Sequence, residues 1–403
     1  LGNVLRNLGK YKDAELYTRK AIKINPDFEI AHSNLGAILQ CQGNLKEAEK
    51  CYRKAIQLNP NYAEGYSNLG NVLRDLGKLK DAEVYIRKAI QLNPNYAEAY
   101  SNLGNVFRDL DNLQEAELNY RKAIAVNPNF ATAYSNLGVI MTNLGNLQEA
   151  ELNYIKAITL NPDLAKVFFD LSILKLTNKS KIWRDKLFSK NFLVNKSKKD
   201  KINIYFAKAN ILHRESNFKE SSKFLQLGNN LKLSQNSYNL KNVFDKSKNL
   251  LKESLKESKR KKLNNQYPQC IFIVGMPRSG STLLESILSM NSDVDDLGEK
   301  NIFEESYLNW KNPSQNSTLG ELYLKKISAY CKELRTTTNK WLYNYLYTGI
   351  ISTQIPNSKI IHCYRNPLDN ILSIYRAHFS TGNVFSSSLV DCAKVYIDQE
   401  EIM

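Results

Sequence analysis

Residues 270–290, CIFIVGMPRSGSTLLESILSM, combine the residue types that can hold a phosphate group. An apolar run predicts a β-strand, Gly275 and Gly280 predict a loop, and the following leucines and isoleucines have helical spacing. A strand, a glycine-bearing loop and a helix aim backbone N–H groups and a helix N-terminus at an anion, which must approach the backbone closely.

The spacing Gly275-x4-Gly280 matches the first half of a nucleotide-binding P-loop. Ser281, however, stands where that loop has lysine, and Arg278 inside the loop supplies the positive charge. The alternative is a buried strand and helix joined by an ordinary glycine turn. That alternative does not explain why proline, arginine, serine and threonine coincide with the two glycines.

A second strand-and-loop element follows at residues 359–376, KIIHCYRNPLDNILSIYR. Its apolar run ends in Arg365, Pro367 opens a helix, and Ser373 lies two turns along that helix. A guanidinium fork and a hydroxyl are suited to a second phosphate. Since position 281 lacks lysine and this strand end lacks the aspartate that would hold magnesium, the pair argues against a nucleoside triphosphatase.

Together the two elements resemble those of sulfotransferases that use 3′-phosphoadenosine 5′-phosphosulfate (PAPS). The first resembles the 5′-phosphosulfate loop and the second the 3′-phosphate site. The resemblance implies an α/β P-loop-like, three-layer domain with a parallel sheet, PAPS as co-substrate and no metal. The implied donor-binding residues are Pro277, Arg278, Ser279, Gly280, Ser281, Thr282, Arg365 and Ser373.

Two further segments extend the resemblance, which includes the tyrosylprotein sulfotransferases. That family has a Gly-Glu whose glutamate is the general base, and Glu299 matches it. Lys340, within Asn339–Asn344, matches a lysine that stabilises charge on the transferred group, together with Arg278 of the loop. The family's proline in this segment is replaced by Leu342 or Tyr343. The alternative for Glu299 is a surface carboxylate in an acidic turn.

Residues 1–164 contain a repeat with a period of 34 residues, marked by prolines at Pro26, Pro60, Pro94, Pro128 and Pro162. The unit resembles the tetratricopeptide repeat (TPR), which has two antiparallel helices. Gly36, Gly70, Gly104 and Gly138 and the alanines of the second helices recur where a side chain would separate the helices. We therefore expect an α-solenoid, a TPR superhelix with a concave face.

An asparagine column recurs in the first helices, at Asn34, Asn68, Asn102 and Asn136. An amide donates and accepts at once, which suits the backbone of an extended peptide. The column resembles the asparagine ladder of O-linked N-acetylglucosamine transferase, so we predict a protein or peptide partner in this groove. The alternatives are another ligand, or residues that were copied with the repeat and have no role.

Composition and charge bear on nucleic-acid binding, metal binding and membrane insertion. The chain of 403 residues carries a net charge of +16, and residues 165–267 hold 25 basic and 8 acidic side chains. This middle segment is predicted to be a degenerate, basic, helical TPR-like region; the alternative is a solvated linker. It contains no nucleic-acid-binding motif, so no nucleic acid is expected. Scattered histidines and cysteines predict no metal site. No apolar run is long enough for a transmembrane helix.

The predicted organisation is therefore a TPR array at 1–164, the basic segment at 165–267, and a sulfotransferase-like domain at 268–403. We expect truncation at both ends, an incomplete C-terminal domain, a cytoplasmic, bacterial-like protein and an undetermined oligomeric state. The predicted reaction moves the sulfuryl group from PAPS to a hydroxyl, on a protein tyrosine or another peptide hydroxyl. The alternatives are a carbohydrate or lipid acceptor, a nucleotide kinase, and a non-catalytic TPR scaffold.

Overall fold

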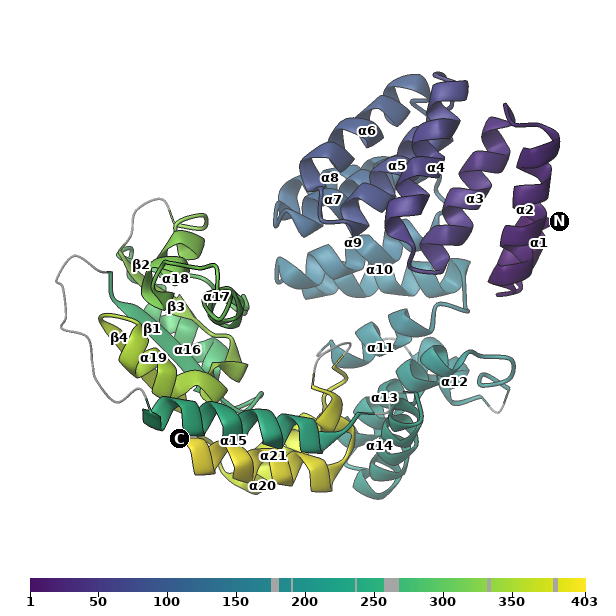
Figure 1. The fold of residues 1–403 in the computed structure, drawn as a ribbon. Helices are drawn as coiled ribbons and strands as arrows, with labels where there is room; N and C mark the ends of the chain where they lie inside the picture. The colour runs from purple at the N-terminus through teal and green to yellow at the C-terminus, as the bar shows by residue number, and fades with distance from the viewer. Residues whose placement is uncertain (175–180, 190, 236–237, 257–267, 332–334, 380–382) are drawn as a thin grey trace. The chain divides into compact units, whose positions relative to one another are not determined.

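A computed structural model describes residues 1–403 except 175–180, 190, 236–237, 257–267, 332–334 and 380–382. Two compact units make up the chain, Leu1–Asn217 and Phe218–Met403 (Figure 1). None of the described helices is both long and apolar enough to cross a membrane.

The first unit is an array of helices, and each repeat helix packs on the next (Figure 1). The repeat helices are α1 (Gly2–Asn7), α2 (Tyr11–Ile24), α3 (Glu29–Cys41), α4 (Leu45–Leu58), α5 (Ala63–Asp75), α6 (Leu79–Leu92), α7 (Ala97–Asp109), α8 (Leu113–Val126), α9 (Ala131–Asn143) and α10 (Leu147–Leu160). Three more follow, α11 (Ala165–Ile173), α12 (Lys181–Phe188) and α13 (Lys198–Arg214). The predicted TPR solenoid is confirmed.

The repeat glycines lie where the two helices of a hairpin approach each other most closely. A Cβ atom on Gly104 would lie 2.7 Å from the Tyr120 ring, and one on Gly70 would lie 2.3 Å from the Ile86 side chain. Contacts of that length force neighbouring atoms to move. Alanines at the facing positions of the second helices are fully buried: Ala14, Ala48, Ala82, Ala116 and Ala150. Small residues therefore set the spacing of each hairpin, as the sequence predicted.

We predict that Gly104→Ala destabilises the first unit by about 1–3 kcal/mol, because the added methyl group pushes α7 away from Tyr120. Urea unfolding followed by helical circular dichroism measures this change. Gln114→Ala on the exposed side of α8 is the control and should be close to neutral. Equal stability of the two variants would contradict the role given to the glycine.

The basic middle segment contributes to both units. Helix α13 packs on α11 within the first unit, whereas α14 (Phe218–Leu233) and α15 (Leu240–Lys256) fall within the second. Residues 257–267, at the end of the predicted segment, lie outside the described residues. The boundaries at 164 and 267 remain predictions.

The second unit contains a four-stranded parallel sheet of order β2-β3-β1-β4. Its strands are β1 (Cys270–Gly275), β2 (Val294–Asp296), β3 (Thr336–Asn339) and β4 (Ser358–Cys363). All six residues of β1 are buried, as an apolar central strand of a parallel sheet should be. This sheet confirms the predicted α/β class.

Helices connect the strands and cover the sheet. They are α16 (Ser281–Leu288), α17 (Ile302–Trp310), α18 (Leu319–Ile327), the 3₁₀ helix η1 (Leu342–Tyr347), α19 (Thr348–Gln354), α20 (Pro367–Arg376), the 3₁₀ helix η2 (Val384–Ser387) and α21 (Leu389–Ile402). Helix α15 contacts α19, η1 and α21, so it is a structural part of this unit.

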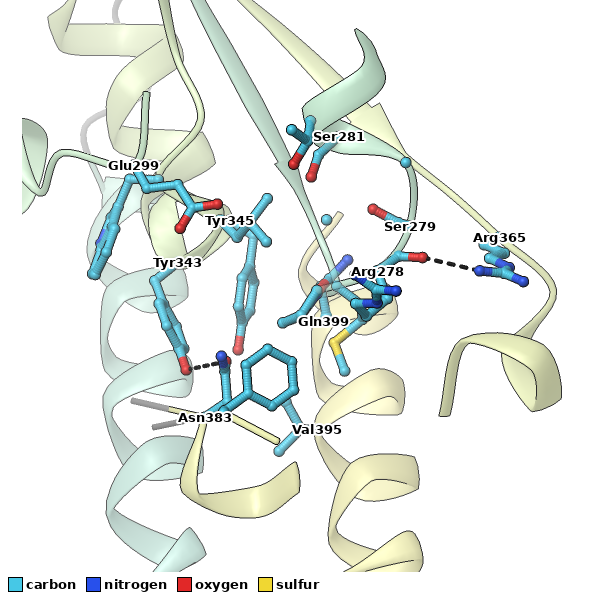
Figure 2. A pocket seen from close by; sticks show the side chains of 18 of the residues that line it. Arg278, Ser279, Ser281, Glu299, Tyr343, Tyr345, Arg365, Asn383, Val395 and Gln399 are labelled. Atoms are coloured by element: carbon cyan, nitrogen blue, oxygen red, sulfur yellow. Dashed lines mark hydrogen bonds between the residues drawn. The ribbon is translucent and has the colours of Figure 1, made fainter. Parts of the chain in front are cut away.

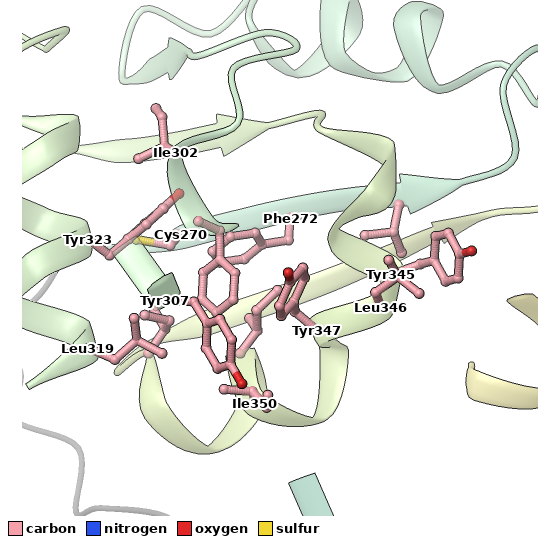
Figure 3. Packing of buried hydrophobic residues seen from close by; sticks show 14 of the residues in the cluster. Cys270, Phe272, Ile302, Tyr307, Leu319, Tyr323, Tyr345, Leu346, Tyr347 and Ile350 are labelled. Carbon is pink, nitrogen blue, oxygen red and sulfur yellow. The ribbon is translucent and has the colours of Figure 1, made fainter. Parts of the chain in front are cut away.

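An aromatic core forms on one face of the sheet (Figure 3). Phe272 of β1 packs on Phe303 and Tyr323 with ring centroids 5.8 and 5.4 Å apart. Tyr347 joins the same cluster, and Leu250 of α15 is buried within it. A smaller core joins Met276, in the loop that follows β1, to Ile374 of α20 and Phe385 of η2.

Candidate active site

The loop after β1 has a backbone that depends on its glycines. Gly275 has φ 145°, and a Cβ atom there would lie 2.5 Å from the carbonyl oxygen of Cys363 at the end of β4. Arg278 adopts a left-handed φ of 68°, and Gly280, with φ 99°, precedes α16, whose N-terminus receives no side-chain cap within the part of the chain that the structure describes. The first N–H groups of α16 are thus left for an external acceptor, as in anion-binding helix N-termini.

The two predicted phosphate elements lie side by side. Arg365 Nη1 donates to the carbonyl oxygen of Arg278 at 3.3 Å, and Arg278 Nε donates to Ser373 Oγ at 3.4 Å. Asn370, fully buried on α20, donates to the carbonyl oxygen of Pro277 at 3.0 Å and so fixes the loop. Sequence reasoning missed Asn370, which has no local signal beyond its place on the helix between Arg365 and Ser373.

The predicted base and cation also meet. Lys340 Nζ lies 2.6 Å from Glu299 Oε1 and donates to Thr282 Oγ1 at 3.2 Å. The 296–300 turn is tied to the end of β3, because Lys340 N–H donates to the Gly298 carbonyl at 2.9 Å. The Asn339 side chain donates to the Lys300 carbonyl at 3.0 Å. These bonds hold Glu299 and Lys340 together.

A second carboxylate is close to Lys340: Glu285 Oε2, on α16, lies 3.8 Å from Lys340 Nζ. Thr338 of β3 donates to Glu285 Oε1 at 3.3 Å. Burial, followed by the neighbouring Asp296, raises the pKa of the Glu285 carboxyl to about 7. Sequence reasoning missed Glu285, since a single glutamate within the loop helix resembles a surface residue.

One cavity of about 940 Å³ joins these groups. Figure 2 shows Glu299 and Arg365 on opposite sides of it, with Arg278, Ser279 and Ser281 between them. Its lining residues are Gly275, Met276, Pro277, Arg278, Ser279, Gly280, Ser281, Thr282, Glu299, Trp341, Leu342, Tyr343, Tyr345, Arg365, His378, Phe379, Asn383, Phe385, Val395 and Gln399. Lys340 and Ser373 lie behind this lining, bonded to Thr282 and Arg278.

The wall beside Glu299 is aromatic. Trp341 and Tyr343 pack with ring centroids 5.6 Å apart, and the Tyr343 hydroxyl donates to Asn383 at 2.9 Å. Burial raises the pKa of Tyr343 to about 12, so this phenol is a donor at neutral pH. The cavity therefore has a cationic side at Arg278 and Arg365 and an aromatic side next to the Glu299 carboxylate.

Among the described residues, no three histidine, cysteine, aspartate or glutamate side chains are grouped to hold a metal ion.

Glu285 predicts a pH dependence of stability. Because its folded pKa is about 7 and its usual value is 4.5, the folded chain retains a proton that the unfolded chain releases, and stability falls as pH rises between these values. Glu285→Gln should remove this loss, so the variant gains up to about 3 kcal/mol relative to wild type between pH 5 and pH 8.

Urea unfolding followed by Trp310 and Trp341 emission, in a Trp183→Phe background, reports on this unit. Glu305→Gln removes an exposed carboxylate that is paired with Lys326 at 2.6 Å, and is the control. A stability difference between Glu285→Gln and wild type that does not change with pH would contradict the raised pKa.

The asparagine column bonds between repeats. Asn102 Nδ2 donates to Ser67 Oγ at 3.0 Å, and Asn68 Nδ2 donates to Ser33 Oγ at 3.4 Å. Asn136 donates to Asn105 instead, at 3.4 Å. Three of the four amides thus link successive first helices, which is a structural role. The predicted peptide contact of Asn34, Asn68, Asn102 and Asn136 remains a prediction.

Comparisons with known proteins agree with the two units. Residues 268–398 match the family model of the sulfotransferase domain. Tetratricopeptide repeat models match residues 1–28, 30–62, 63–96, 85–117, 104–145 and 131–164. The chain therefore combines a TPR array with a sulfotransferase domain.

An uncharacterized protein of Aquifex aeolicus (strain VF5) is 31% identical over 131 residues, which are 27% of this chain and 17% of that protein. Among solved structures, MamA is 28% identical with a TM-score of 0.34, over 41% of this chain and 97% of MamA. A thermophilic TPR protein of Thermus thermophilus is 25% identical with a TM-score of 0.40, over 43% of this chain and 94% of that one.

Proposed function

We propose that the second unit transfers a sulfuryl group from PAPS to a hydroxyl acceptor. The observation that carries this proposal is one cavity that joins two phosphate elements, the 276–282 loop and Arg365, to a carboxylate paired with a lysine. The match to the sulfotransferase domain supports a sulfate donor of the PAPS type.

The residues present fit such a donor. The loop offers backbone N–H groups and the Arg278 guanidinium to the 5′-phosphosulfate, and Ser279 Oγ is buried and has no hydrogen-bond partner among the described residues. Arg365 and Ser373, joined through Arg278, supply donors for a 3′-phosphate. When bound, PAPS supplies the sulfuryl group and departs as 3′-phosphoadenosine 5′-phosphate.

Side chains of this protein accept the proton and stabilise the charge during the transfer. Glu299 accepts the proton of the acceptor hydroxyl as its oxygen bonds to sulfur. Lys340 and Arg278 offset negative charge on the group in transfer, and the loop holds it in line with the acceptor. Thr282, bonded to Lys340, keeps the cation directed at the loop.

A protein or peptide hydroxyl, such as a tyrosine, is the proposed acceptor. Trp341 and Tyr343 beside Glu299 form a wall that suits a planar apolar ring. A TPR array is a protein-interaction module, and its asparagine column is the proposed contact for the acceptor chain. A sugar or lipid hydroxyl is the alternative acceptor.

The donor site is tested by calorimetric titration with 3′-phosphoadenosine 5′-phosphate, with the same nucleotide lacking its 3′-phosphate, and with ATP. We expect binding to require the 3′-phosphate and to weaken about 10- to 100-fold in Arg365→Ala, which loses charge-assisted bonds. Lys359→Ala removes a charge from an exposed position of the same strand and should bind normally. A preference for ATP, without dependence of binding on the 3′-phosphate, would contradict the proposed donor site.

Catalysis is tested by sulfate transfer from labelled PAPS to tyrosine-containing peptides, sugars and lipids. Glu299→Gln should lower kcat by about 10²- to 10⁴-fold because the base is lost, with nucleotide affinity unchanged. Lys340→Met should also lower kcat. The controls Glu305→Gln and Lys325→Met lie away from the cavity and should retain activity. If Glu299→Gln keeps full activity, Glu299 is not the base.

A further inference from the structure

Lys340 is a buried cation with more than one counter-ion. Its side chain is 5% exposed, and its ammonium is close to three groups, Glu299, Thr282 and Glu285. A buried ammonium is costly unless a carboxylate and hydrogen bonds offset its loss of water. The position of the Lys340 ammonium therefore depends on its carboxylate and hydroxyl neighbours.

The two carboxylates differ in their surroundings. Glu299 is 64% exposed and lines the cavity, so an acceptor can reach it. Glu285 is 4% exposed and is held on its far side by the Thr338 hydroxyl. Asp296 is the other charged group that acts on Glu285. One carboxylate is accessible to chemistry, and the other is fixed within the fold.

The proposed reaction changes the charges around the Lys340 ammonium. When Glu299 takes the acceptor proton, it becomes neutral, and its ion pair with Lys340 is lost. Without another carboxylate, the buried ammonium would keep only the Thr282 hydroxyl just when charge develops on the transferred group. Glu285, at 3.8 Å, is placed to supply that second carboxylate.

We propose that Glu285 is a positioning residue for sulfuryl transfer, because its carboxylate holds the Lys340 ammonium at the loop once Glu299 is protonated. This proposal rests on the proposed function for its catalytic part. It transfers no proton through Glu285: the acceptor proton goes to Glu299, and Glu285 acts only as an anion. Because burial and Asp296 raise the pKa of Glu285 to about 7, its carboxylate is fully ionised only above neutral pH, which gives the proposed role a measurable pH dependence.

A stability experiment tests the proposal without activity. Glu299→Gln imitates the protonated base, and Glu285→Gln keeps the shape and the bond from Thr338 while removing the charge. At pH 8 we expect Glu285→Gln to raise the urea midpoint in the wild-type background and to raise it less, or lower it, in the Glu299→Gln background. Equal shifts in both backgrounds would overturn the proposal. Glu305→Gln is the matched control and should shift both backgrounds alike.

Kinetics supply the second readout. We expect kcat of Glu285→Gln to fall about 10-fold or more with unchanged affinity for 3′-phosphoadenosine 5′-phosphate. Wild-type kcat should rise with pH as Glu285 ionises near pH 7. This rise in the pH profile should be absent in Glu285→Gln. An unchanged kcat and pH profile would overturn the catalytic role, since Gln preserves the packing. If wild type transfers no sulfate, the proposed function fails. The unfolding comparison between the wild-type and Glu299→Gln backgrounds still decides whether the Glu285 carboxylate holds the Lys340 ammonium.

Discussion

The parallel pairing of β1 with β3 and β4 is the constraint on which the site depends. In a parallel sheet the carboxyl ends of the strands meet at one edge, where ligands bind in open α/β sheets. The loop follows β1, Glu299 follows β2, Lys340 follows β3 and Arg365 follows β4. Gly275 allows β1 and β4 to approach so closely that the loop folds against Arg365. Polar and charged residues that are far apart in the sequence of the domain are thereby brought together around one cavity.

Next to that cavity, the burial of Lys340 constrains which charged groups surround it. A surface lysine could change partners freely in water, whereas a buried one must be matched by groups already in place. Glu299, Thr282 and Glu285 provide that match from three different segments. The exposed carboxylate of Glu299 and the buried carboxylate of Glu285 thus share one cation.

The helices before the sheet show how the basic middle segment is used. Its charge suggested a solvated linker as one alternative, but Leu250 of α15 is buried in the aromatic core, and Tyr307 donates to Glu253 at 2.8 Å. Helix α15 is amphipathic: it buries one face on the sulfotransferase domain and carries lysines elsewhere. Net charge described the surface of this segment and gave no information about its apolar face.

The sequence by itself determined the 34-residue repeat, the small-residue columns and the residue pattern of both predicted phosphate elements. These features arise from local backbone needs and from repetition, so they are visible along the chain. Only the tertiary structure decided that Glu285 faces Lys340, that Asn370 fixes the loop and that the repeat asparagines bond to the preceding repeat. Each of these contacts joins residues far apart in sequence, and a single glutamate or asparagine carries no period or motif that reveals its partner. Their roles depend on burial and on the register of the sheet, which exist only when the chain is folded.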